Sequence, residues 1–389
     1  MRVLFFVEGF TDIRFVVGLS EICDLTMAVP AKQYTESGLK QRVIESKVPI
    51  IVDEISGNRL AFQIRSFAYL WKKVRDFDVI LSQEVLRGSL NTNLVGLFKR
   101  VPVVTYMGIS PVEYFRCRRE RRQIGPIKGF LGEILIRTLM TINGRLATRC
   151  LAMGPYLRDI AAPYCPRSEM GLYYGVDTEV FHPAEASEIT MLRKRHDLPT
   201  DKFIVFLSSR ISHEKDPETV LLATSIARSR GLDAVLINLG GGFEDFIKLA
   251  EELKLPDWKH WVIGRPAAHP MSEVADYFRA ADVMALASFA EGAAFSTLEA
   301  LACGTPVVAT AVGGMRVQLD GYARLVPCRD PNTMAHELLW IAKHREEAVT
   351  QALKGREYVI REWNRQKAFR DLLNVLTEVN KTQAKRELL

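Results

Sequence analysis

The sequence predicts an α/β protein with two doubly wound domains, each built on a parallel sheet. Short, nearly unbroken apolar segments recur along both halves of the chain, as expected for parallel strands that are covered on both faces. Amphipathic stretches of helical period separate these segments, which is the alternation of βαβ units. The chain has 389 residues, and single hydrophobic cores rarely grow beyond about 250–300 residues, so two domains are expected.

The first domain is expected over residues 1–182. Four apolar segments predict its strands, at 2–7 (RVLFFV), 78–82 (DVILS), 101–106 (VPVVTY) and 150–153 (CLAM). The stretch between the third and fourth segments differs from the rest of the chain in charge.

Residues 112–150 contain nine basic side chains against three acidic ones, an excess that equals the formal charge of +6 of the whole chain. The basic residues are Arg116, Arg118, Arg119, Arg121, Arg122, Lys128, Arg137, Arg145 and Arg149. Such a local excess suggests an anionic surface as a neighbour. No recognised nucleic-acid-binding module accompanies the cluster, so no nucleic-acid partner is expected.

The same segment contains an apolar stripe at helical spacing, formed by Ile127, Leu131, Ile134, Leu135, Leu139 and Ile142. The simplest interpretation is a helix that packs this stripe against a sheet. Clustered basic residues beside an apolar helix are also the composition of an interfacial anchor. Docking of residues 112–150 on anionic lipid headgroups is therefore the alternative hypothesis.

The spacing of the cysteines indicates the cellular compartment in which the protein works. The chain has six cysteines, and they show neither C-x-x-C nor zinc-ligand spacing: Cys23, Cys117, Cys150, Cys165, Cys303 and Cys328. The sequence thus predicts no metal site and no disulfide framework, and we expect a reducing, cytoplasmic environment. No apolar run reaches the roughly 18–20 residues that span a bilayer, so any membrane contact is expected to be peripheral.

The second domain is expected over residues 183–363, with the boundary near Pro183. Residues 182–201 are polar, contain two prolines and precede a new apolar segment. Strands are predicted at IVFLSS, AVLINL, HWVIG, VMALAS, PVVAT and ARLVP, with helical stretches between them.

Residues 287–314 (ASFAEGAAFSTLEALACGTPVVATAVGG) carry the most information about function. They run from the end of an apolar strand through Glu291 and Gly292 into a helix that is expected to begin at Ser296. Doubly wound folds bind ligands at such strand–loop–helix units, at the carboxyl edge of the sheet, and the free amides of the helix N-terminus suit phosphate.

On these residues the sequence resembles retaining glycosyltransferases of family 4, whose GT-B fold consists of two facing Rossmann-like domains. The family signature has two glutamates separated by seven residues and a following run like ACGTPVV, which Glu291, Glu299 and residues 302–308 match. Residues 208–218 (SSRISHEKDPE) resemble the phosphate-binding run of the family, with Arg210 and Lys215 at its two basic positions. Residues 173–183 and 277–288 also resemble family segments.

The resemblance implies a retaining, nucleotide-sugar-dependent hexosyltransferase. The donor is expected to be a UDP-hexose, and the acceptor a hydroxyl of a lipid-linked or polysaccharide precursor. Arg210, Lys215 and Glu291 are the expected catalytic residues. Two fixed cations beside a leaving diphosphate stabilise the charge that develops on it, so no metal and no other cofactor is expected. Glu291 is expected to accept hydrogen bonds from the donor sugar.

The other donor-binding residues that the resemblance implies are Gly9, Gly264, Arg265, Gly292, Ala293, Ala294, Phe295 and Glu299. Gly9 is equally consistent with an ordinary turn after the first strand. Glu299 is expected to contact the ribose, but Ser296 and Glu299 also have the spacing of a capping box, which needs no ligand. The final helix, at about 364–389, is expected to pack on the first domain, as in the family.

Four positions depart from the family pattern. Ala293 and Ala294 replace an aromatic residue and a glycine, Met107 replaces a histidine, and Val317 replaces a glutamate. These departures keep two alternatives open: a catalytically silent GT-B protein that binds sugar nucleotides or acts as a scaffold, and a GT-B epimerase.

Overall fold

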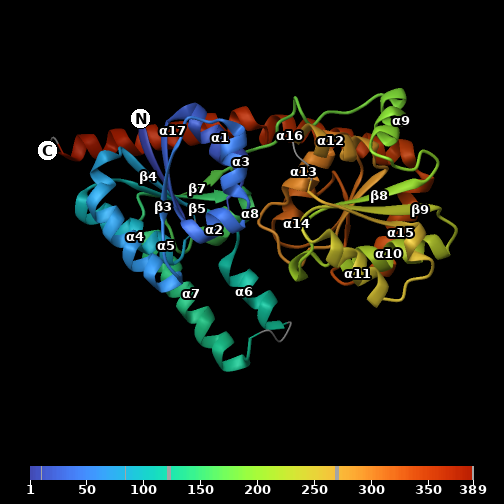
Figure 1. The fold of residues 1–389 in the computed structure, drawn as a ribbon, viewed down its shortest axis with the longest axis horizontal. Coiled ribbons are helices and arrows are strands. Elements are labelled where there is room, and N and C mark those ends of the chain that lie inside the picture. Colours follow the sequence, from blue (N-terminus) through green and yellow to red (C-terminus); the bar gives the residue numbers. More distant parts are fainter. Residues whose placement is uncertain (10, 84, 121–123, 268–270, 388–389) are drawn as a thin grey trace. The chain divides into compact units, whose positions relative to one another are not determined.

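The computed structural model describes residues 1–9, 11–83, 85–120, 124–267 and 271–387. The chain forms two compact units (Figure 1). The first consists of Met1–Gly175 with Gln366–Leu389, and the second of Val176–Arg365. Arg121 and Arg122, two members of the predicted basic cluster, lie outside the described residues.

The first unit contains a seven-stranded sheet in the order β3-β2-β1-β4-β5-β6-β7, in which every pairing is parallel. Its strands are β1 (Arg2–Val7), β2 (Asp24–Pro30), β3 (Ile51–Ile55), β4 (Val79–Gln83), β5 (Val103–Met107), β6 (Arg149–Met153) and β7 (Ser168–Gly171). All residues of β1 after Arg2 are buried, as its apolar sequence predicts. The strand order reverses between β1 and β4.

In the described part of this unit the sheet is accompanied by nine α-helices: α1 (Ile13–Ile22), α2 (Ala31–Glu36), α3 (Leu39–Ser46), α4 (Arg59–Lys73), α5 (Arg87–Lys99), α6 (Pro111–Glu120), α7 (Pro126–Leu146), α8 (Gly154–Ala161) and α17 (Arg365–Glu387). The terminal helix α17 packs against α1 within the unit. The rings of Phe15 and Phe369 are stacked with their centres 6.1 Å apart. A Cβ atom at Gly18 would lie 1.9 Å from the Phe369 ring, so glycine makes room for that ring.

The apolar stripe of α7 faces solvent, and the expectation that it packs against the sheet is wrong. Ile127 is 75% exposed and Leu131 59% exposed. The buried residues of α7 are instead Gly129, Met140, Asn143 and Gly144. A Cβ atom at Gly132 would lie 2.4 Å from the ring of Phe115 in α6, so glycine at this position allows a close approach of the two helices.

The second unit contains a six-stranded parallel sheet in the order β10-β9-β8-β11-β12-β13. Its strands are β8 (Phe203–Ser208), β9 (Ala234–Leu239), β10 (Val262–Arg265), β11 (Val283–Leu286), β12 (Val307–Thr310) and β13 (Arg324–Val326). Each lies where an apolar segment predicted it. The strand order reverses between β8 and β11, and the predicted class of doubly wound α/β sheets is confirmed.

The helices of the second unit are α9 (Ala186–Arg195), α10 (Pro217–Ser229), α11 (Phe243–Glu252), α12 (Met271–Ala280), α13 (Phe295–Ala302), α14 (Gly313–Leu319), α15 (Pro331–Lys343) and α16 (Arg345–Glu362). A buried ion pair attaches α9 to the sheet: Arg193 Nη2 lies 2.8 Å from Asp282 Oδ2, and Asp282 also accepts the backbone amide of Ile204 at 2.7 Å. Among the described residues, no helix is both long enough and apolar enough to cross a bilayer.

Candidate functional site

The predicted site residues of the second unit follow the carboxyl ends of its strands. Arg210 and Lys215 come after β8, and Glu291 comes after β11. These two strands are neighbours, and the strand order reverses between them. Ligands of doubly wound sheets bind outside the carboxyl ends of the strands at this kind of reversal, so the topology by itself marks the position.

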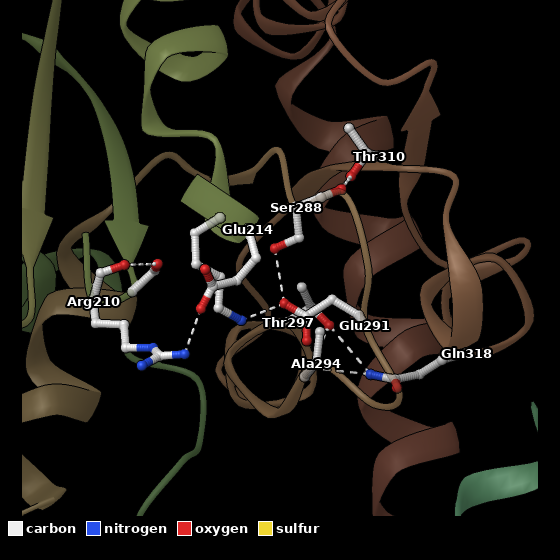
Figure 2. A network of polar contacts seen from close by, with 10 residues as sticks. Arg210, Glu214, Ser288, Glu291, Ala294, Thr297, Thr310 and Gln318 are labelled. Carbon is white, nitrogen blue, oxygen red and sulfur yellow. Dashed lines mark hydrogen bonds and ion pairs between the residues drawn. The ribbon is translucent and has the colours of Figure 1, made fainter. Parts of the chain in front are cut away.

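Lys215 and Glu291 are in direct contact. Lys215 Nζ forms an ion pair with Glu291 Oε1, and the two side chains are 22% and 11% exposed. Ser288 Oγ donates a second hydrogen bond to the same carboxylate oxygen at 2.8 Å (Figure 2). Thr310 Oγ1 in turn donates to the carbonyl oxygen of Ser288 at 2.6 Å, which connects this segment to the end of β12. The carboxylate is thus held in place from three neighbouring strand ends.

Arg210 has a different partner. Its guanidinium contacts Glu214 Oε1 at 2.5 Å, and its side chain is 65% exposed (Figure 2). The amide of Phe289 donates to the carbonyl oxygen of Glu214 at 2.8 Å, which ties the segment after β8 to the segment after β11. The two predicted cations therefore lie in one connected network, but each is paired with its own carboxylate.

The loop at Glu291 and Gly292 is pressed against the start of α14. A Cβ atom at Gly313 would lie 2.3 Å from the carbonyl oxygen of Glu291, and one at Gly314 would lie 1.9 Å from that of Gly292. Gly313 also has a positive φ of 46°, which glycine adopts without strain. The double glycine of this sequence is thus required by the position of the glutamate loop.

Gln318 holds the same loop from the next turn of α14. This side chain is buried, and its Nε2 donates to the carbonyl oxygen of Ala294 at 3.1 Å and to Thr297 Oγ1 at 3.2 Å. Thr297 Oγ1 also donates to the Ala294 carbonyl at 2.7 Å. Sequence reasoning missed Gln318 and Ser288, because a single polar residue without a spacing partner gives no motif.

The start of α13 tests the capping-box interpretation of Glu299. The helix begins at Phe295, and its N-cap is Ala294 and not Ser296. Ser296 is therefore inside the helix, and the capping box does not form. Glu299 is 5% exposed.

Ala293, Ala294 and Phe295 are buried, and the ring of Phe295 packs edge-on against Trp363 with the centres 6.0 Å apart. These three residues shape the loop and the helix start.

Gly264 and Arg265 lie apart from them at the end of β10, which β9 separates from β8. A Cβ atom at Gly264 would lie 2.9 Å from the carbonyl oxygen of Phe243, so glycine is needed for the packing of α11.

Gly9 belongs to the first unit, where it follows β1 at the reversal between β1 and β4. The preceding residue, Glu8, accepts a hydrogen bond from Gln63 Nε2 at 2.8 Å and pairs with Arg87 at 3.2 Å. Glu8 belongs to no recognisable motif, so the sequence analysis did not include it among the site residues. Met107, the last residue of β5, is 1% exposed.

Comparison with known proteins gives a family for the second unit. Residues 188–358 match the family described as Glycosyl transferases group 1, and the resemblance predicted from the sequence is confirmed. The chain is 32% identical over 205 residues to D-inositol 3-phosphate glycosyltransferase of Saccharomonospora viridis, a match that covers 49% of this chain and 46% of the relative. It is 36% identical over 177 residues to the protein of that name in Frankia alni, covering 42% of each. The chain thus matches less than half of the length of these curated relatives.

Solved structures resemble the whole fold. Anabaena Alr3699/HepE, in complex with UDP, aligns with a TM-score of 0.76 over 97% of this chain and 100% of its own, at 16% identity. Sucrose-phosphate synthase from Thermosynechococcus elongatus aligns with a TM-score of 0.74 over 98% of this chain and 100% of its own, also at 16% identity. These similarities establish a common fold.

Proposed function

We propose that this chain, whose residues 188–358 match Glycosyl transferases group 1, is a retaining glycosyltransferase that uses a nucleotide sugar. The observation that carries the proposal is the Lys215–Glu291 pair at the reversal between β8 and β11. It combines a cation for a leaving diphosphate with a carboxylate for sugar hydroxyls. Alr3699/HepE has been solved with UDP and with UDP-glucose, which supports UDP-glucose as the first donor to test.

Charge stabilisation of the leaving group is the proposed basis of catalysis. Negative charge develops on the diphosphate as the glycosidic bond breaks, and cations that contact it favour the transition state over the bound substrate. Arg210, being largely exposed, exchanges Glu214 for a phosphate oxygen when the donor binds. Lys215 contacts the second phosphate while Glu291 turns to the sugar. Glu299 contacts the ribose, and Gly264 and Arg265 complete the part of the donor site that the second unit provides. In this proposal no metal is required.

The proposed acceptor is a hydroxyl of a lipid-linked or polysaccharide precursor. We place the reaction at the cytoplasmic face of a membrane, which the first unit contacts through residues 112–150. The exposed apolar stripe of α7 supports this location, because the interpretation that would have buried it is wrong. A neutral glycan in solution would give no reason for that stripe.

A catalytically silent nucleotide-sugar-binding protein is the second candidate, and an epimerase of the same fold is the third. The buried Met107 favours the silent protein, since it offers no proton acceptor at a position where the family has a histidine. The products formed from UDP-glucose distinguish these three candidate functions. Release of UDP without acceptor indicates a transferase, binding without release indicates a silent protein, and a changed sugar on intact UDP indicates an epimerase.

The test is a donor screen by thermal shift followed by UDP release, with EDTA present throughout. A ligand at 100 times its dissociation constant stabilises the folded protein by about 2.7 kcal/mol, a readily measured shift. We expect UDP-glucose to stabilise the protein and to be hydrolysed slowly, and Lys215→Ala to lose the hydrolysis. Lys202→Ala is the matched control. Lys202 also pairs with a carboxylate, that of Asp233, but both residues lie at the amino ends of β8 and β9, opposite the candidate site. Equal loss in both variants, or no binding of any nucleotide sugar, would refute the proposal.

A further inference from the structure

Three neighbouring helices of the first unit expose large apolar side chains. Twelve of the twenty-one large apolar side chains that are exposed among the described residues lie on α4, α5 and α7. We call this set the apolar face: Leu60, Ile64, Phe67 and Trp71 of α4, Leu97 and Phe98 of α5, and Ile127, Phe130, Leu131, Ile134, Leu135 and Ile142 of α7. Concentrations of exposed apolar surface mark interaction sites.

The α4 part of the apolar face has the spacing of one helix face. Its four residues follow the pattern i, i+4, i+7, i+11. The opposite face of α4 is already buried in the core, where Leu70 is 0% and Phe62 3% exposed. α4 is therefore apolar on two sides, and the core accounts for only one of them.

Aromatic contacts join the α4 and α5 parts. Phe67 and Trp71 are stacked with ring centres 6.0 Å apart, and Trp71 lies 6.2 Å from Phe98 in α5. Lys99 Nζ lies 3.9 Å from the centre of the Trp71 ring. α5 packs against both α4 and α7 (Figure 1), so the three helices form one continuous layer of the unit.

The charges of these helices indicate what covers the face. Together α4, α5 and α7 carry one acidic residue, Glu133, and nine basic ones: Arg59, Arg65, Lys72, Lys73, Arg87, Lys99, Lys128, Arg137 and Arg145. Three of these cations form ion pairs within the unit, with Asp53, Glu8 and Glu133. A second copy of this chain would present the same excess and be repelled. Lipid phosphates complement it, while an apolar phase accepts the exposed side chains.

We propose that α4, α5 and α7 dock together on an anionic lipid bilayer. The apolar face enters the boundary between headgroups and acyl chains, and the basic side chains extend to the phosphates. The inference rests on the membrane contact in the proposed function but extends it to two helices outside residues 112–150. Its test does not use turnover, so its failure is distinguishable from failure of glycosyl transfer.

Tryptophan fluorescence offers a direct test, because Trp71 is the one tryptophan of the first unit and Trp258, Trp261, Trp340 and Trp363 belong to the second. The full chain is mixed with vesicles of phosphatidylcholine and phosphatidylglycerol whose acyl chains carry bromine. We expect quenching of the wild-type emission, and loss of that quenching in Trp71→Phe although the variant still binds. Quenching that is equal in both proteins would overturn the docking of α4.

Co-sedimentation with the same vesicles, without bromine, tests the whole face. The double variants Trp71→Ser with Phe98→Ser and Ile134→Ser with Leu135→Ser should each bind at least tenfold more weakly than the wild type. Leu353→Ser with Ile360→Ser is the matched control, since both residues are exposed in the second unit, and its binding should stay within twofold. Circular dichroism confirms that each variant is folded. Binding that is independent of phosphatidylglycerol, unchanged binding of the α4–α5 variant, or a dimer in sedimentation velocity that these substitutions abolish would refute the proposal.

Discussion

Lys215 and Glu291 form an ion pair between the segments that follow two adjacent strands, β8 and β11. The pair joins residues that are 76 positions apart in the sequence. In the proposed function an incoming donor opens this pair, because its phosphate oxygens replace the carboxylate at the lysine and its sugar hydroxyls replace the lysine at the carboxylate. The first two predictions concern this exchange.

Arg210→Ala or Lys215→Ala should reduce turnover by about 10²–10³, the scale for losing one group that stabilises transition-state charge. The melting temperature of the Arg210 variant should hardly change, because its side chain is 65% exposed. Single-turnover rates with saturating donor measure the effect on the chemical step. Near-normal rates in both variants would contradict the assignment of these cations.

Glu291→Gln and Glu299→Gln should affect different steps. The first variant should lose turnover, since an amide accepts hydrogen bonds from sugar hydroxyls more weakly than a carboxylate. The second should weaken UDP binding by about tenfold, a loss of about 1.4 kcal/mol, in line with one hydrogen bond to a charged group. Release of UDP from the nucleotide sugar measures the first effect, and titration calorimetry with UDP measures the second. Unchanged affinity in Glu299→Gln would remove the ribose role.

Gly314→Ala should impair turnover by displacing the glutamate loop, since the added Cβ atom would lie 1.9 Å from the carbonyl oxygen of Gly292. Overpacking of this kind costs about 1–3 kcal/mol of folding free energy. Gly241→Ala is the matched control, because a Cβ atom there meets no other atom within 4 Å. Urea unfolding and UDP release compare the two, and equal behaviour would show that the loop position is unimportant.

Asp282 keeps its ion pair with Arg345 and the hydrogen bond from the amide of Ile204 when Arg193 is replaced. Arg193→Ala should still destabilise the second unit by about 1–3 kcal/mol, because it breaks the buried ion pair between Arg193 and Asp282. The two side chains are only 8% and 3% exposed. Arg195→Ala, two residues along the same helix, removes a cation that is 66% exposed and should cost about 0–1 kcal/mol. Urea denaturation distinguishes them, and similar midpoints would show that the buried pair contributes little.

The stabilisation that Glu133 provides should depend on pH. Hydrogen bonds from Arg116, and then from Arg137, lower the pKa of this carboxyl from 4.5 to about 2. A carboxyl whose pKa is lower in the folded state stabilises the fold above its unfolded pKa, and this is lost as pH falls through the folded value. The melting temperatures of wild type and Glu133→Gln should therefore differ by a constant amount above pH 5 and converge toward pH 2. A difference that is independent of pH would contradict the ion pairs.

Apolar runs predicted ten of the thirteen strands in the described part of the chain, including the edge strands β10 and β13, and missed β2, β3 and β7 of the first unit. The internal strand β2 (DLTMAVP) was missed although its residues from Leu25 to Val29 are buried. Strands such as β1 and β8 are covered on both faces, and their continuous apolar runs are diagnostic. The edge strands β3 (IVDEI) and β7 (SEMG) have partly exposed, polar sequences that give no such signal. The polar stretch at 182–201 likewise concealed α9, because this helix buries only Leu192 and Arg193 and has no apolar stripe.

The candidate site was predictable as a set of motifs but not as a geometry. The motifs indicated Lys215 and Glu291 separately, and only the placement of β8 beside β11 shows that they pair. Gln318 was missed because its hydrogen bond to the carbonyl oxygen of Ala294 follows from its buried position in the fold, which no spacing in the sequence indicates. Helical period correctly predicted α7 and the residues that share its face, but period contains no information about what covers that face.

The packing of the Phe369 ring against α1 at Gly18 has a consequence for synthesis on the ribosome. The first unit is discontinuous, so its final helix leaves the ribosomal exit tunnel only after every residue of the second unit has been made. Domains usually fold as units during translation, N-terminal first. Here the second unit can reach its native state while α1 still lacks the aromatic ring that packs on it, and a segment translated after the second unit completes the core of the first.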